Sequence, residues 1–142
     1  MTYSLTRRAA LIGGACAAML ALTSVPSQAA AKIQRLVSPG GIEAWFVQDA
    51  TVPLIAMEYS FGGGASQDPP GKPGVGNLVA DLLDEGSGDL DSKTYHERLE
   101  RRAIELSFAS NRDQFRGSLR MLKDNKDEAY DLLRMALTSP RF

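Results

Sequence analysis

From Lys32 onward, the chain alternates apolar and polar residues in short runs that are typical of half-buried strands. Five segments show this pattern: 32–37, 42–48, 54–61, 104–110 and 113–122. Glycine, proline and polar residues separate the first three, with the turn "SPGG" between the first two. Asn111 and Arg112 join the last two. The pattern therefore predicts five strands, most of them joined by short turns.

Three other segments show helical spacing instead: 73–85, 92–104 and 126–137. Pro73 suits the first turn of the first helix, and Gly86 and Gly88 are expected to end it. Asp91 or Ser92 is expected to cap the second helix, and Asp124 or Asn125 to start the third. The predicted inward residues are Leu78, Val79, Leu82 and Leu83, then Tyr95, Leu99 and Ala103, then Tyr130, Leu133, Ala136 and Leu137. The order β-β-β-α-α-β-β-α predicts an α+β fold, a largely antiparallel sheet with helices packed on one face.

Residues 1–31 have the pattern of a signal peptide. A basic start at Arg7 and Arg8 leads into an apolar run and then into small residues such as Ala29-Ala30-Ala31. The arginine pair also resembles a twin-arginine export signal. We therefore expect residues 32–142 to form the mature, truncated domain, located in the periplasm or secreted, with no stable membrane span after cleavage.

Charge and cysteine content exclude several classes of protein. Cleavage after residue 31 lowers the 16 basic residues to 14 against 17 acidic ones, a net charge near −3, which argues against a nucleic-acid partner. The one cysteine, Cys16, lies in the signal, so the mature chain can form neither disulfides nor thiolate metal sites. The one histidine, His96, stands beside Glu97 and Arg98 and is expected to face solvent.

Two other sequence patterns are candidate ligand-binding sites. The glycine-rich loop before residue 75 does not match a phosphate loop, because Lys72 is followed by Pro73 rather than by serine or threonine. Asp81, Asp84 and Glu85 have the spacing i, i+3, i+4, so they could meet on one helical face and bind a hard cation. A solvated helix end is the preferred interpretation, since surface carboxylates are common there.

The stretch "GGIEAWFVQDATVPLIAMEYSFGGGASQDPPGKPGVGNLVADLLDEGSG" resembles the N-terminal part of insulinase/pitrilysin-type peptidases, the inverzincins. The resemblance covers residues 33–142. It places Asn77, Ala80 and Asp81 at the positions of the His-x-x-Glu-His motif. That motif holds zinc with two imidazoles and activates water with the glutamate. The resemblance therefore implies a degenerate motif, with no catalytic residue and no metal in this chain.

The same resemblance implies a partner. Dimeric members, such as mitochondrial processing peptidase, pair a zinc-bearing subunit with a motif-free one, and "LLDEGSGDLD" resembles the latter. Substrate peptides in the family add to a sheet edge, which corresponds here to Phe108, Ala109, Ser110 and Asn111. Since such a sheet would normally continue beyond Phe142, the chain is expected to be an N-terminal fragment.

The leading prediction is an exported, non-catalytic insulinase-family subunit that scaffolds and helps capture peptide for a zinc-bearing catalytic partner. Two alternatives stay open. One is a metallopeptidase with a non-standard metal on Asp81, Asp84 or Glu85. The other is a stand-alone periplasmic peptide-binding module.

Overall fold

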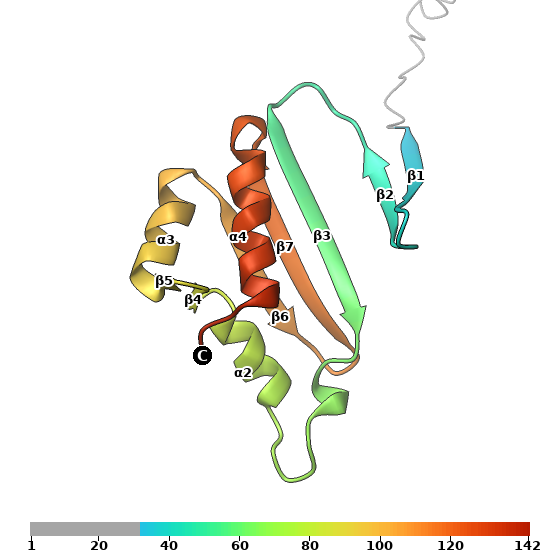
Figure 1. Cartoon of the computed structure of the whole chain (residues 1–142). Helices are drawn as coiled ribbons and strands as arrows, with labels where there is room; N and C mark the ends of the chain where they lie inside the picture. The colour runs from blue at the N-terminus through green and yellow to red at the C-terminus, as the bar shows by residue number, and fades with distance from the viewer. Residues whose placement is uncertain (1–31) are drawn as a thin grey trace, which may run out of the picture. The chain divides into compact units, whose positions relative to one another are not determined.

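The computed structural model describes residues 32–142, and Figure 1 shows their arrangement. The predicted signal peptide, with Arg7, Arg8 and Cys16, lies outside the described residues. The chain divides after Asp49 into two compact units. Within residues 32–142, no helix has both the length and the apolarity needed to cross a membrane.

The first unit is an antiparallel hairpin of β1 (Ile33–Val37) and β2 (Glu43–Val47). Arg35 and Glu43 form a bidentate ion pair across it, with an Nε to Oε1 distance of 2.7 Å. Trp45 pairs with Arg35 in the ladder, and Phe46 pairs with Gln34, so large apolar side chains stand on both faces. Both are exposed, at 70% and 43%. The two predicted strands are confirmed, but the hairpin is apolar on two sides rather than one.

The second unit contains a three-stranded antiparallel sheet in the order β3-β7-β6 (Figure 1). Its strands are β3 (Leu54–Gly62), β6 (Glu105–Ser110) and β7 (Gln114–Leu122). In the register, Gly117 of the central strand lies between Tyr59 and Phe108. The Tyr59 ring covers Gly117 so closely that a β-carbon at position 117 would collide with its hydroxyl end. The remaining three predicted strands are thus confirmed, and the sheet is antiparallel as expected.

Three α-helices and two short 3-10 turns complete this unit. The α-helices are α2 (Val75–Leu82), α3 (Ser92–Arg101) and α4 (Lys126–Thr138), and the 3-10 turns are η1 (Ala65–Gln67) and η2 (Lys123–Asn125). A short hairpin, with strands of two residues each, separates α2 from α3. Its strands are β4 (Gly86–Ser87) and β5 (Leu90–Asp91). In Figure 1, α4 lies across one face of the sheet. The predicted α+β class and the order of the main elements are confirmed, and the β4–β5 hairpin and the two 3-10 turns are additions.

The core lies between the helices and one face of the sheet. Its buried residues are Tyr95, Leu99, Ile104, Leu106, Leu119, Met121, Ala129, Leu132, Leu133 and Ala136. The Tyr95 hydroxyl donates to the backbone oxygen of Leu132 at 2.9 Å and so ties α3 to α4. Because odd and even positions of a strand face opposite ways, the other sheet face carries polar residues such as Glu58, Ser107 and Ser118.

Several predicted core positions are wrong. On α4, Tyr130 and Leu137 are 42% and 38% exposed, because the helix turns its small residues Ala129 and Ala136 to the core and so approaches the sheet closely. Ala103 is exposed and has φ 48°, since α3 ends at Arg101 and the chain turns there.

The first helix is also shorter than predicted. It starts at Val75 rather than Pro73 and ends at Leu82, and Leu78 is 58% exposed rather than inward. Gly86 does not cap it, because Gly86 and Ser87 pair with β5 and with the segment after α4. There the Arg141 amide donates to the Gly86 carbonyl at 3.1 Å, and the Gly88 amide donates to Ser139 at 2.8 Å.

Candidate functional site

The degenerate motif lies on α2, and its three positions have different surroundings. Asn77 and Asp81, one turn apart, are exposed, whereas Ala80 is only 3% exposed. Zinc in such a motif needs two imidazoles, and the water needs a carboxylate base between them. This chain offers a neutral amide, a methyl group and one carboxylate. The donor set therefore does not fit the zinc ion that an intact His-x-x-Glu-His motif holds.

Asp68 fixes the start of α2. Its Oδ2 accepts a hydrogen bond from the Gly74 amide at 2.6 Å, and its Oδ1 accepts one from the Gly76 amide at 2.8 Å. A carboxylate that binds amides at a helix N-terminus satisfies donors that have no partner inside the helix. These two hydrogen bonds tie the Gly-Pro loop to the start of α2.

The acidic set Asp81, Asp84 and Glu85 does not form a metal cluster. Asp81 lies within α2, and the other two follow its end. Glu85 accepts a hydrogen bond from the Ser92 hydroxyl at 2.6 Å. Among residues 32–142, no group of three or more histidine, cysteine or acidic side chains is gathered closely enough to hold a metal ion.

His96 is half-buried rather than free in solvent. Its Nε2 lies 3.9 Å from Oε1 of Glu85, and its ring meets that of Tyr95 edge-on. The neighbouring Asp84 carboxyl is partly buried, and this burial raises its pKa above the usual value. The charges of Glu85 and Asp81 raise the pKa further, whereas His96 lowers it.

The predicted substrate-binding residues lie on an edge strand. Phe108, Ala109 and Ser110 belong to β6, which within residues 32–142 pairs only with β7, and Asn111 lies in the turn that follows. The Asn111 amide donates to the Gln114 carbonyl at 2.9 Å, which makes positions 111 and 114 a hydrogen-bonded pair. Hydrogen-bonded and non-hydrogen-bonded pairs alternate along an antiparallel ladder. Leu106, Phe108 and Ser110 therefore belong to non-hydrogen-bonded pairs, and their backbone N–H and C=O groups point away from β7. None of these three has another backbone partner in the part of the chain described.

The end of this edge is firmly anchored. The Ala65 amide of η1 donates to the Asn111 carbonyl at 2.8 Å, and the Ser66 amide donates to Arg112 at 2.8 Å. Gly64 passes so close to the Asn111 carbonyl that no side chain would fit there, and its φ of 85° also favours glycine. The α2 helix packs against β6 just beyond. The edge is therefore held in place beside the degenerate motif.

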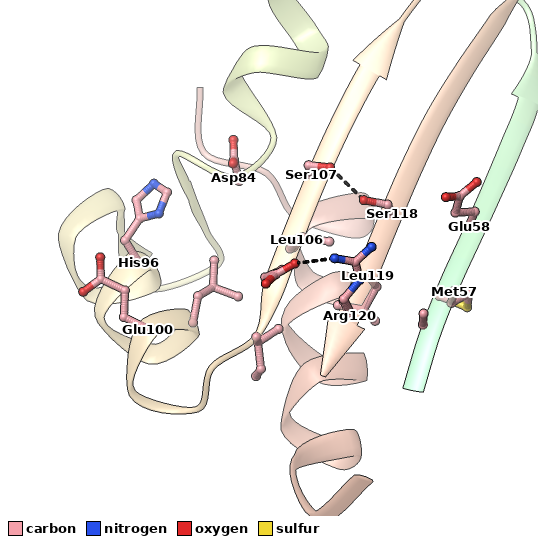
Figure 2. Close-up of a pocket in the computed structure, with 14 residues that line it drawn as sticks. Met57, Glu58, Asp84, His96, Glu100, Leu106, Ser107, Ser118, Leu119 and Arg120 are labelled. Atoms are coloured by element: carbon pink, nitrogen blue, oxygen red, sulfur yellow. Dashed lines mark hydrogen bonds and ion pairs between the residues drawn. The ribbon is translucent and has the colours of Figure 1, made fainter. Parts of the chain in front are cut away.

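A depression of about 450 Å³ runs from the outer sheet face past the free edge of β6 toward α3 (Figure 2). We call it the β6 groove. Figure 2 shows Asp84, His96 and Glu100 on the helical side of β6, with Ser107, Ser118 and Glu58 on the strands. The Ser107 and Ser118 hydroxyls are 2.8 Å apart, and Arg120 pairs with Glu105 at 3.2 Å. Sequence spacing alone did not predict that Asp84 and Glu100 lie at this groove. The two residues are far apart along the chain, and the tertiary fold brings both of them to β6.

Comparison with known proteins gives one curated relative and several solved structures. No family model matches the chain. The chain is 27% identical over 115 residues to the non-peptidase homolog YmxG of Helicobacter pylori, a match that covers 81% of this chain and 27% of that protein. The chain thus spans about a quarter of the length of this relative.

Two crystal structures resemble the fold. One is the peptidase M16 inactive domain from Pseudomonas fluorescens, with a TM-score of 0.71 and 26% identity over 78% of this chain and 27% of that one. The other is a protease from Helicobacter pylori, with a TM-score of 0.65 and 16% identity over 80% of this chain and 27% of that one. The second likeness shows the fold alone.

Proposed function

We propose that this chain, an inactive homologue of the M16 or insulinase-type peptidases, captures extended peptides for a separate zinc-bearing partner subunit. The insulinase-type resemblance expected from the sequence is confirmed by both comparisons. Each relative named as inactive supports a chain without catalytic metal. The partner, the peptide and the scaffolding role are our proposal.

One observation carries the proposal: an unpaired strand edge lies beside the degenerate motif. The outward backbone groups of Phe108 and Ser110 have the spacing that a further strand needs. Peptides commonly bind by adding a strand to such an edge, where main-chain hydrogen bonds supply affinity without a fixed sequence. This geometry is suited to bind and orient a peptide, and the aligned motif positions carry Asn77, Ala80 and Asp81 in place of two histidines and a glutamate.

Location is part of the proposal. The basic, apolar and small-residue order of residues 1–31 supports export to the periplasm. Fractionation of cells that produce the chain with and without these residues tests this point. Equal amounts of both forms in the cytoplasm would contradict export.

The partner role is tested by co-expression with the product of a neighbouring reading frame that carries His-x-x-Glu-His. We expect the two chains to purify together and to cleave an unstructured peptide, whereas the chain alone cleaves none. Undiminished cleavage by the partner without this chain would contradict the capture role. Chelator-sensitive cleavage by the isolated chain would instead favour a non-standard metal site, and peptide binding without any copurifying partner would favour a stand-alone binding module.

A further inference from the structure

The sheet has a second free edge, along β3, on the side opposite β6. In the described part of the chain, β3 pairs only with β7. The Gly63 amide donates to the Asp113 carbonyl at 2.9 Å, so the odd positions of β3 form the hydrogen-bonded pairs with β7. The backbone groups of the even positions, which include Ala56, Glu58 and Ser60, therefore point away from the sheet and can pair with a further strand.

The two faces of β3 differ in polarity. Ile55, Met57 and Tyr59 are half-buried and pack against the core. Glu58 is exposed on the other face, and within residues 32–142 it forms no ion pair. A strand that pairs with this edge thus needs apolar side chains on one face and a positive charge near Glu58 on the other.

The β3 strand of a second copy of this chain meets both needs. It fits when the two strands run antiparallel and the two Met57 residues face each other on a two-fold axis. Ile55 of one copy then lies opposite Tyr59 of the other, so an apolar ladder continues across the interface. On the outer face, Ala56 of one copy lies opposite Glu58 of the other.

The charges also favour this register. Ala56 lies opposite Arg120 of β7 in its own chain. The Glu58 carboxylate of one copy and the Arg120 guanidinium of the other therefore flank a small alanine side chain and can meet above it, twice by symmetry. A register centred on Glu58 would instead place two carboxylates opposite each other, which is destabilising.

We infer that β3 is a self-association edge, at which two copies of this chain pair antiparallel about Met57 and join their three-stranded sheets into one. A sheet of six strands is of ordinary size. The inference goes beyond the proposed capture of peptides and does not depend on it, because it uses the opposite edge of the sheet and leaves β6 free.

Sedimentation equilibrium of the purified protein tests the charge arrangement. We expect the wild type to dimerise as concentration rises. Both Glu58→Arg and Arg120→Glu should weaken dimerisation about tenfold, because each turns two attractions into repulsions. The double variant carries opposite charges again and should recover most of the affinity. Circular dichroism checks that each variant is folded.

Arg116→Glu is the matched control for Arg120→Glu. It makes the same charge change on the same strand and face, but Arg116 lies opposite Ser60 in its own chain. In the inferred register, this position is distant from Glu58 of the second copy. The variant should therefore dimerise as the wild type does.

Cysteine cross-linking tests the register. The one natural cysteine is first removed by Cys16→Ser. Under mild oxidation, Met57→Cys should give a disulfide-linked dimer, because facing α-carbons of a non-hydrogen-bonded pair lie within disulfide distance. Ser60→Cys, on the same strand, should not, since antiparallel pairing about position 57 keeps the two copies of position 60 apart.

Three results would overturn the inference. The first is a protein that stays monomeric at every concentration. The second is a dimer that Arg120→Glu and Arg116→Glu affect equally, which would place the association on another surface. The third is a dimer that cross-links as well through position 60 as through position 57.

Discussion

At the scale of single residues, Asp68 determines where α2 begins. Replacing it with alanine leaves the amides of Gly74 and Gly76 without their acceptor. We predict that Asp68→Ala lowers the free energy of unfolding by about 1–2 kcal/mol. Urea denaturation of the variant and of Asp89→Ala, which removes an exposed acid from the β4–β5 turn, measures it. Equal free energies of unfolding for the two variants would show that the two hydrogen bonds of Asp68 do not stabilise the protein.

Asp84 is expected to make stability depend on pH. Its pKa lies above the usual 3.8 in the fold, so folding disfavours the ionised carboxylate. The resulting loss of stability is present at neutral pH and disappears as the pH falls below the unfolded value. Asp84→Asn should therefore raise the melting temperature slightly at pH 7, by about 1–2 °C for a half-exposed group, and leave it unchanged near pH 3. Thermal melts across this range, with Asp89→Asn as control, test the sign. A lower melting temperature at pH 7 would contradict it.

At the scale of elements, α2 uses position 80 for packing. Ala80, which the resemblance aligns with the motif's glutamate, is only 3% exposed. We predict that Ala80→Glu destabilises the protein by about 3 kcal/mol, because it buries a carboxylate without a partner. Asn77→Glu adds the same charge at an exposed position one turn earlier and should cost less than about 0.5 kcal/mol. Chemical denaturation compares the two, and equal stability would mean that position 80 readily admits a base.

The edge of β6 allows a test of strand addition that separates binding from folding. Proline at position 110 removes an outward amide hydrogen, whereas proline at position 109 removes one that bonds to β7. We predict that Ser110→Pro keeps the fold but loses peptide binding at least tenfold, measured by the fluorescence anisotropy of a labelled peptide. Ala109→Pro should instead lower stability by about 3 kcal/mol. Unchanged peptide affinity in Ser110→Pro would place binding elsewhere.

The elements themselves were largely predictable, because each depends on local patterns. Strand alternation identified β3, β6 and β7, and the Asp91 cap identified the start of α3, where Asp91 accepts from the Thr94 amide at 2.8 Å. The face of α4 was not predictable from spacing, since its core stripe depends on how closely alanines let it approach the sheet. The end of α2 was missed because Gly86 is used in a distant pairing with the chain after α4.

At the scale of the whole molecule, the three-stranded sheet leaves both β3 and β6 as edges within residues 32–142. Unpaired edges invite pairing with other chains. We predict that purified residues 32–142 associate as concentration rises, as seen by light scattering. The proposed zinc-bearing partner, if it covers the β6 edge, should suppress this association. A sample that stays monodisperse and melts cooperatively at high concentration would contradict the prediction.

The candidate site was predictable only in part, because it is assembled by tertiary structure. The resemblance placed Phe108 to Asn111 at a sheet edge, and the structure puts Phe108, Ala109 and Ser110 on an edge strand. The acidic side chains of the β6 groove were missed, since Asp84 and Glu100 meet the groove from different elements. Their chemistry was visible in the sequence, but their proximity was not.

The contact of Tyr59 with Gly117 has a consequence for how such chains can evolve. The ring occupies the space that any side chain at 117 would need. Exchange of this glycine therefore requires the tyrosine ring to move away or to become smaller, so substitutions at the two sites should be linked. Lineages with a bulky residue at one site should carry a small one at the other, and this covariation would identify the pair without any structure.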